Sequence, residues 1–182
     1  MTISELRAQC LQCDKCELSA VRTKVVFGTG DEHARIMLVG EAPGKNEDET
    51  GEPFAGRAGD LLNSYLAAVG LHREDVYIAN ILKCRPPQNR DPLPEEQDMC
   101  IDWLREQFKL VSPKIILCLG RISARRLIGE DFLVTRDHGR IFKKHEVLMM
   151  GTFHPAALLR NPNNKSLVLD DFQKLAQCAQ EE

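Results

Sequence analysis

Seven cysteines give this chain its clearest chemical signature. Five of them lie near charged loops, turns or helix starts: Cys10, Cys13, Cys16, Cys84 and Cys100. Thiolates bind zinc or iron–sulfur clusters, and four thiolates at loose spacing fit either centre. Cys118 lies inside an apolar run and is predicted to be a core thiol. The spacing leaves zinc and iron open, and a set of scattered buried thiols is the structural alternative.

A glycine–proline turn with acidic neighbours is the second chemical feature. The turn Gly40–Gly44 (GEAPG) follows an apolar run, and its two glycines and its proline leave backbone N–H groups exposed. Four carboxylates crowd the same loop: Glu41, Glu47, Asp48 and Glu49. They would repel a phosphate, and the phosphate-loop pattern G-x-x-x-x-G-K-[ST] is absent from the sequence. The loop is either solvated or suited to stabilising a cationic sugar-like centre or activating water.

Phe54 and Asn80 stand in contexts that core packing explains poorly. Phe54 lies between a proline and an Ala-Gly pair, outside any helical stripe, so it is either a hydrophobic plug or a stacking platform for a flat ligand. Asn80 interrupts an apolar strand, and a buried amide needs partners. Its carboxamide could cap a turn, but its acceptor and donors also match the O4 and N3–H of uracil, whereas cytosine presents the reversed pattern.

His154 ends an apolar run and is followed by Pro155. At that place an imidazole could donate a proton to an anionic leaving group, although a lone histidine is often structural. The next residues of note are Leu158, Leu159 and Arg160. A short apolar and basic segment of this kind suits a wedge that opens a nucleic-acid duplex. The alternative for this segment is the start of a buried helix.

These side chains require elements that bring them together. Short apolar runs predict four buried strands, at Arg35–Gly40, Val76–Leu82, Ile115–Gly120 and Val147–Phe153. Helical patterns are expected at Gly59–Val69, Pro94–Val111, Ile122–Ile128 and Leu167–Ala179. Alternating strands and helices predict a parallel sheet covered on both faces, with ligands at the carboxyl ends of the strands. Three unusual stretches fall at such ends: Gly40–Gly44, Asn80–Arg85 and Thr152–Pro155.

Composition predicts one soluble domain. The chain has 182 residues, of which 43% are hydrophobic and 28% charged. A net charge of −3 excludes strong, indiscriminate binding of nucleic acid by bulk charge, but it permits a local basic patch. We find no apolar run of the ~20 residues that a membrane helix needs, and no signal-peptide pattern at the start. We therefore expect a cytoplasmic protein that does not bind membranes.

Taken jointly, the motifs resemble the family 4 uracil-DNA glycosylases, the iron–sulfur group. The resemblance runs from about residue 10 to residue 172. The matching stretches are Gly40–Gly44 with Glu47 and Asp48, Gly51–Leu62 (GEPFAGRAGDLL), Asn80–Pro94 (NILKCRPPQNRDPLP), Phe153–Pro162 (FHPAALLRNP) and Cys13-x-x-Cys16-x-Leu18 with Arg22.

This resemblance implies a three-layer α/β/α sandwich around a central four-stranded parallel sheet, forming one glycosylase domain over residues 1–182. It implies hydrolysis of the N-glycosidic bond of uracil in DNA, leaving an abasic site without strand cleavage. The substrate would be uracil-containing DNA, single- or double-stranded, and the protein a monomer. The alternatives are a zinc-containing nucleotide-binding module and a redox protein without glycosylase activity.

The resemblance also implies roles for individual residues. A structural [4Fe–4S] cluster would be held by Cys13, Cys16, Cys84 and Cys100, with Cys10 outside the set. Uracil would be bound by Gly40, Ala42, Phe54, Asn80 and His154. The catalytic residues would be Glu41, Glu47 and His154. DNA would be contacted by Arg57, Arg85, Leu158, Leu159 and Arg160, with Arg121, Arg125 and Arg126 as further candidates for phosphate contact.

One departure concerns the water that attacks the sugar. Better-known uracil glycosylases carry an aspartate two positions after the glycine of the first motif, and this chain has Ala42 there. The carboxylate that handles the water is therefore open among Glu41, Glu47 and Asp48, and we favour Glu41 or Glu47.

Overall fold

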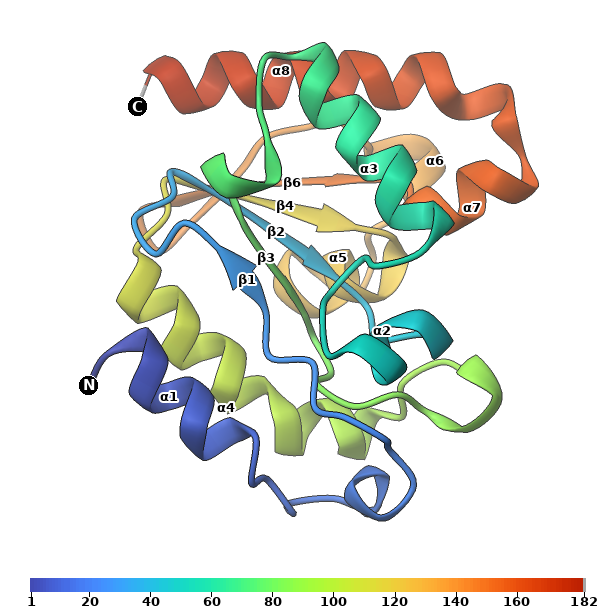
Figure 1. The fold of residues 1–182 in the computed structure, drawn as a ribbon. Coiled ribbons are helices and arrows are strands. Elements are labelled where there is room, and N and C mark those ends of the chain that lie inside the picture. The colour runs from blue at the N-terminus through green and yellow to red at the C-terminus, as the bar shows by residue number, and fades with distance from the viewer. Residues whose placement is uncertain (182) are drawn as a thin grey trace.

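A computed structural model of the protein describes residues 1–181. The protein has a six-stranded sheet with helices on both faces (Figure 1). In the order β1-β3-β2-β4-β6-β5, the strands are β1 (Thr29–Gly30), β3 (Tyr77–Asn80), β2 (Ile36–Gly40), β4 (Ile115–Leu119), β6 (Val147–Thr152) and β5 (Phe142–Lys144). The four central strands run parallel to one another. At the two edges, β1 pairs antiparallel with β3 and β5 pairs antiparallel with β6. The predicted parallel sheet of four strands is confirmed as the centre of a larger mixed sheet.

The central strands are apolar because both faces of the sheet are covered. Every residue of β2, β3 and β4 is buried, as expected of parallel strands between helical layers. The register aligns Leu38 with Ile78 on one side and with Leu117 on the other, and Leu117 with Met150. All four side chains belong to one core cluster on one face of the sheet.

Eight helices surround the sheet in the described chain. They are α1 (Ile3–Cys10), α2 (Lys45–Thr50), α3 (Arg57–Ala68), α4 (Pro94–Val111), α5 (Arg121–Leu127), α6 (Val134–Asp137), α7 (Pro155–Arg160) and α8 (Lys165–Glu181). Helices α3, α7 and α8 pack on one face, while α4 and α5 pack on the other and α1 lies against α4 (Figure 1). The predicted α/β/α layering is therefore confirmed. None of these helices is long and apolar enough to span a membrane.

Helix α4 shows how local sequence sets the helix ends. Pro94 occupies the first turn, and the Glu96 carboxylate accepts the Leu93 backbone N–H at 2.9 Å. The helix ends at Ser112, which adopts a left-handed conformation with φ of 53°. It covers the predicted range, and the other three predicted helices agree within two residues at each end.

The hairpin β5–β6 adds an edge strand that the apolar pattern did not predict. Lys144 pairs with Val147, so only His145 and Glu146 form the turn, and both have positive φ, of 49° and 67°. A two-residue turn of this kind normally carries Asn or Gly. Because His145 and Glu146 are neither, the sequence pattern did not indicate a hairpin here.

Strand β3 ends at Asn80, two residues before the predicted end. Beyond it, Ile81 and Leu82 donate their backbone N–H groups to the carbonyls of Gly40 and Glu41, each at 3.0 Å. The ends of β2 and β3 therefore remain side by side after the ladder proper. This is the edge of the sheet at which the predicted site residues gather.

Candidate active site at the carboxyl ends of the strands

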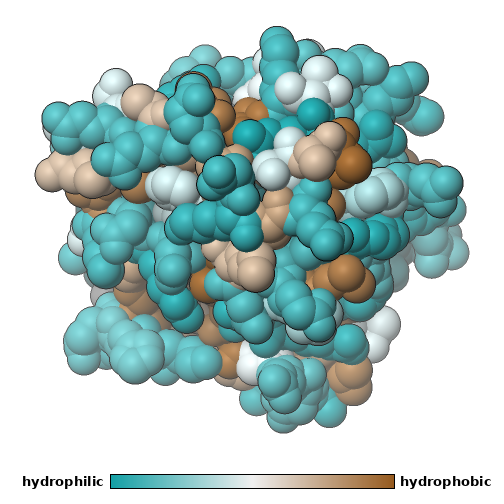
Figure 2. All heavy atoms as spheres, turned by 90° about the horizontal axis from the view of Figure 1, so that it is seen from below, coloured by the Kyte–Doolittle hydropathy of each residue, from teal (hydrophilic) through white to brown (hydrophobic). Residues whose placement is uncertain are grey.

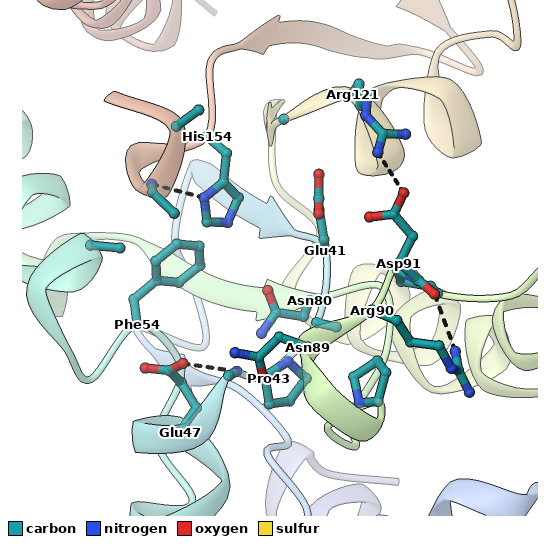
Figure 3. Close-up of a pocket in the computed structure, with 18 of the residues that line it drawn as sticks. Glu41, Pro43, Glu47, Phe54, Asn80, Asn89, Arg90, Asp91, Arg121 and His154 are labelled. Atoms are coloured by element: carbon teal, nitrogen blue, oxygen red, sulfur yellow. Dashed lines mark hydrogen bonds and ion pairs between the residues drawn. The ribbon is translucent and has the colours of Figure 1, made fainter. Parts of the chain in front are cut away.

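One pocket opens where the four parallel strands end. It is lined by residues that follow β2, β3, β4 and β6, by Phe54 before α3 and by the loop that precedes α4 (Figure 3). Phe54, Asn80 and His154, separated by up to a hundred residues in the chain, all line it. The predicted convergence of these three side chains is therefore found in the structure.

Gly40 lets the end of β2 pass close under two of these side chains. A Cβ atom at this position would lie 2.7 Å from Cζ of Phe54 and still nearer to Oδ1 of Asn80. Only glycine leaves that space free. Gly40 thus shapes the floor of the pocket through its backbone, and Ala42 lines the pocket beside it.

Phe54 is held in an unusual backbone conformation by its surroundings. Its φ is 52°, and the Arg73 guanidinium donates to the carbonyls of Phe54 and Pro53 at 3.2 and 2.7 Å. Gly59 lies directly beneath the Phe54 carbonyl, where any side chain would collide with it. The Phe54 ring faces His154, with ring centroids 5.5 Å apart and planes at 27°. Arg73 was not predicted, because nothing in its local sequence distinguishes it from a surface arginine.

Asn80 offers its amide to the pocket. The residue is 3% exposed and its side chain makes no hydrogen bond to another described residue, yet no sealed side-chain polar atom in the described chain lacks a partner, so its amide atoms reach the open pocket. Because both polar atoms of a buried amide need partners, this group is available to a ligand.

His154 has a defined tautomer. Its Nδ1 accepts the backbone N–H of Ala156 at 3.1 Å, at the start of α7, so a neutral ring carries its proton on Nε2. Burial, together with the charge of Arg160, lowers the pKa of His154 to about 4. The side chain is therefore a neutral donor at physiological pH.

The two favoured carboxylates lie in different environments. Glu47, in α2, accepts the backbone N–H groups of Gly44 and Ala55, each at 2.9 Å, so both of its oxygens tie one loop to the next. Glu41 is largely buried; burial raises its pKa, while Arg121 and the backbone N–H of Ile122 act in the opposite direction. Asp48 is buried away from the pocket lining, where it accepts the N–H groups of Thr23 and Lys24.

The loop before α4 supplies three pocket residues that were not predicted: Asn89, Arg90 and Asp91. Asn89 has a φ of 56° and accepts Nε of Arg85 at 2.7 Å. The Arg90 guanidinium binds both Glu96 oxygens at 2.8 Å, and Asp91 pairs with Arg121. Their signal was the dense run of polar residues in the Asn80–Pro94 motif, which the sequence did not resolve into individual functions.

The predicted DNA-contacting set is only partly on the surface. Leu158 is 1% exposed and packs in the core, so its assignment to a DNA wedge is wrong. Neighbouring positions on a helix point about 100° apart, and α7 turns Leu158 toward the core. Leu159 is 38% exposed, and Arg57 and Arg160 are exposed. Arg160 and Arg121 both line the pocket. Arg121 is paired with Asp91 there, and Arg126 is paired with Asp98.

Four predicted ligands surround a second, small cavity. Cys13, Cys16, Cys84 and Cys100 all line it, and no cysteine in the described chain forms a disulfide. Three N–H groups point at sulfurs: Arg22 Nη1 at Cys84 (3.4 Å), Trp103 Nε1 at Cys13 (3.4 Å) and the Lys83 backbone at Cys100 (3.3 Å). Donors of this kind stabilise thiolates and tune iron–sulfur clusters.

The chemistry of this donor set suits a thiolate-bound centre. Four cysteine sulfurs around one cavity, with N–H groups directed at three of them, fit an iron–sulfur cluster. Among the described residues, no three Cys, His, Asp or Glu side chains are arranged to hold a single metal ion. Cys118, in β4, is fully buried, as predicted for a core thiol. Cys10 lies outside this cavity and is also fully buried, which its polar sequence neighbourhood did not indicate.

The side of the molecule that carries α1 and α4 is mainly hydrophilic. Figure 2 looks onto the molecule from below the view of Figure 1 and shows hydrophobic side chains scattered between hydrophilic ones. Exposed apolar residues near the cysteine cavity include Leu93 and Met99, at 45% and 47% exposure. Small separate patches of this kind need no partner to explain them.

Comparison with known proteins identifies the family. The family model described as "Uracil DNA glycosylase superfamily" matches residues 27–176. A type-4 uracil-DNA glycosylase of Archaeoglobus fulgidus is 41% identical over 97% of this chain and 92% of its own length. Type-4 uracil-DNA glycosylases of Sulfurisphaera tokodaii and Thermotoga maritima are 41% and 43% identical, over 98% and 90% of this chain and 85% and 87% of their own lengths. The chain therefore belongs to the uracil-DNA glycosylase superfamily, and within it to the type-4 family.

Proposed function

We propose that this protein is a DNA repair enzyme that hydrolyses the bond between uracil and deoxyribose in DNA. The observation that carries the proposal is the convergence of Phe54, Asn80 and His154 in one pocket at the carboxyl ends of the strands. The target nucleotide must leave the base stack to reach this pocket, which costs a few kcal/mol. Membership of the family supports the same reaction.

Asn80 and Phe54 would recognise the base. The free amide of Asn80 can donate to O4 of uracil and accept from N3–H, while the Phe54 ring stacks on the flat face. Cytosine presents an amino donor and a bare nitrogen at these positions, so it would leave the amide unpaired. Sites of this kind reject the wrong partner by roughly 10⁴–10⁵-fold.

His154 would stabilise the departing base. As the bond between C1′ and N1 breaks, its electron pair goes to uracil, whose negative charge spreads onto O2. The neutral imidazole donates Nε2–H toward that oxygen, because Nδ1 is already engaged by the N–H of Ala156. A fixed donor aimed at developing charge contributes roughly 10²–10³ in rate.

Glu41 is the carboxylate that we assign to the sugar. The bond breakage leaves positive charge on the deoxyribose, and Glu41 lines the pocket with its negative charge, whereas both oxygens of Glu47 bind backbone N–H groups. Water then adds to C1′ and releases its proton, giving free uracil and an abasic site. No lysine lines the pocket in the described chain, so no amine is placed to form a Schiff base with the sugar.

We further propose that Cys13, Cys16, Cys84 and Cys100 hold a [4Fe–4S] cluster. When bound, the cluster would supply a structural cross-link between the N-terminal loop, the segment after β3 and helix α4. The four sulfurs around one cavity, the three N–H···S contacts and membership of the type-4 family support this ligand set.

DNA would lie across the mouth of the pocket. Arg57, Arg85 and Arg160 are candidates for phosphate contact, and exposed Leu159 for the wedge that fills the space of the flipped base. Action on single- and double-stranded DNA, a single domain over residues 1–182, a monomeric state and a cytoplasmic location stay predictions.

Incubation with matched oligonucleotides tests the proposed reaction. Strands carrying one uracil, cytosine or thymine at the same position are treated with the protein and then with alkali, which cuts only at abasic sites. We expect cleavage of the uracil strand after alkali and intact strands without it. The Asn80→Ala, His154→Ala double variant, purified in the same way, controls for contaminating enzymes. Equal reaction of all three strands, or none of any, would overturn the proposal.

A further inference from the structure

Lys83 is a buried cation without an acidic partner. The residue is 1% exposed and lies between Leu82 and the proposed ligand Cys84. Its Nζ donates to the Phe27 carbonyl at 3.0 Å and to Oε1 of Gln107 at 2.6 Å. Both acceptors are neutral, and Gln107 is itself held by hydrogen bonds to the Phe27 carbonyl and to the Tyr77 hydroxyl.

Neutral acceptors do not balance a buried charge. No Asp or Glu of the described chain forms an ion pair with Lys83. An unpaired charge in the interior is costly enough that buried lysines normally pair with an anion. The described chain supplies no carboxylate to balance the charge of Lys83. We therefore expect a negative group of another kind near this side chain.

The proposed cluster would be that negative group. Lys83 lines the same cavity as the four cysteines, and its own backbone N–H donates to Sγ of Cys100 at 3.3 Å. Four thiolates outweigh the positive charge of a [4Fe–4S] core, so the assembled centre is an anion.

We propose that Lys83 is the internal counter-cation of the cluster, setting its reduction potential and its retention. This inference rests on the proposed cluster and not on the glycosylase reaction. A cation in a water-free site favours the form of the cluster with more negative charge, because the attraction is weakly screened there. Removing it should lower the reduction potential and weaken the hold on iron.

Two variants and one matched control test the proposal in the iron-containing protein. Lys83→Met removes the charge but keeps an unbranched side chain. Gln107→Glu keeps Lys83 and gives it a carboxylate partner, so it also cancels the charge seen by the cluster. Lys15→Met removes an exposed lysine that lines the same cavity and is screened by water. The readouts are the midpoint potential by protein-film voltammetry and the rate of iron loss to a chelator.

We expect Lys83→Met and Gln107→Glu each to shift the reduction equilibrium at least tenfold toward the oxidised form, or about 59 mV for one electron. Iron loss should be at least tenfold faster than in Lys15→Met. If Lys83→Met fails to fold, Gln107→Glu decides. Both measurements unchanged would overturn the proposal, as would wild-type protein without iron. Uracil release is measured separately, so its absence would count against the enzyme assignment and leave the counter-cation result standing.

Discussion

At the scale of single residues, the pocket presents three side chains whose orientations are set before any ligand arrives. Asn80 projects from the end of β3 with both polar atoms free, Phe54 is locked by Arg73 and Gly59, and His154 has its proton directed to Nε2 by the N–H of Ala156. Such preorganisation means that little rearrangement opposes the reaction.

Replacing Asn80 with aspartate should reverse part of the recognition pattern. A carboxylate offers only acceptors when ionised, so it loses the donor to O4 of uracil and gains an acceptor for the amino group of cytosine. We expect Asn80→Asp to lower the ratio of uracil release to cytosine release by at least tenfold in single-turnover assays. An unchanged ratio would remove Asn80 from base recognition.

Truncating His154 tests the leaving-group assignment. His154→Ala should slow single-turnover release of uracil by at least tenfold, and roughly 10²–10³-fold if the donor acts on the full developing charge. Affinity for DNA should change little, because the imidazole is directed into the pocket and not at the backbone of the nucleic acid. A wild-type rate in this variant would defeat the assignment.

The depressed pKa of His154, at about 4, makes a separate prediction about pH. The neutral form is the donor that we assign, so the imidazole should stay neutral from pH 8 down to about pH 5 and take up a proton only as the pH approaches 4, as followed by NMR of the ring. An unfolded chain takes up a proton on this histidine near its ordinary pKa of about 6.5. The contribution of His154 to stability is therefore present above pH 6.5 and lost progressively toward pH 4. An imidazole that titrates near pH 6.5 in the folded protein would contradict this environment.

At the scale of elements, two loops form the mouth of the site and are tied together by one side chain. Glu47, in α2, binds Gly44 of the first loop and Ala55 beside Phe54 in the second. Hydrogen bonds to a charged group are worth about 1.5–3 kcal/mol. This carboxylate thus couples the glycine–proline turn to the aromatic wall of the pocket.

Glu47→Ala should therefore lower the free energy of unfolding by about 2–4 kcal/mol and raise the KM for a uracil oligonucleotide. Glu49→Ala is the matched control, because Glu49 lies in the same helix, is exposed and makes no hydrogen bond within the described chain. Denaturant unfolding and steady-state kinetics measure the two effects. Equal stability of the two variants would show that Glu47 does not hold the loops.

Elements with strong patterns were predictable from the sequence, and those set by isolated contacts were not. Continuous apolar runs predicted the four parallel strands, and period-3.6 stripes predicted α3, α4 and α8. The short helix α7 was only an alternative reading of an apolar and basic segment, and that uncertainty placed Leu158 on the surface when it belongs to the core. Strand β5 was missed because its turn, His145–Glu146, lacks the usual residues.

The same contrast applies to the site. Phe54, Asn80 and His154 were predictable because each breaks an otherwise regular pattern. Arg73 and the three N–H groups that point at cysteine sulfurs were not, since such contacts depend on which loops meet in three dimensions. The sequence also left Glu41 and Glu47 equivalent, and only their hydrogen bonds separate them.

At the scale of the whole molecule, the cysteine cavity adds a connection between the N-terminal loop and two elements of the main core, β3 and α4. Cys13 and Cys16 lie in the loop after α1, Cys84 follows β3, and Cys100 lies in α4. Loss of a single cross-link that closes a long loop costs roughly 2–5 kcal/mol. A cluster that ties three segments should contribute at least as much.

Removing iron with a chelator should therefore lower the unfolding midpoint by roughly 5–15 °C for a chain of this length. It should also open the N-terminal loop to trypsin at Lys15, which lies between Cys13 and Cys16, and at Arg22, which follows them. Calorimetry and limited proteolysis of the same samples measure both effects. Identical unfolding midpoints and digestion patterns with and without iron would show that the centre does not cross-link the three segments.

The pocket lining without lysine has a consequence for the cell. In the reaction that we propose, no amine of the described lining is placed to bind the sugar, so the strand stays unbroken and carries one sugar without a base. Completing the repair would then require a second class of enzyme, one that cuts DNA at a baseless sugar.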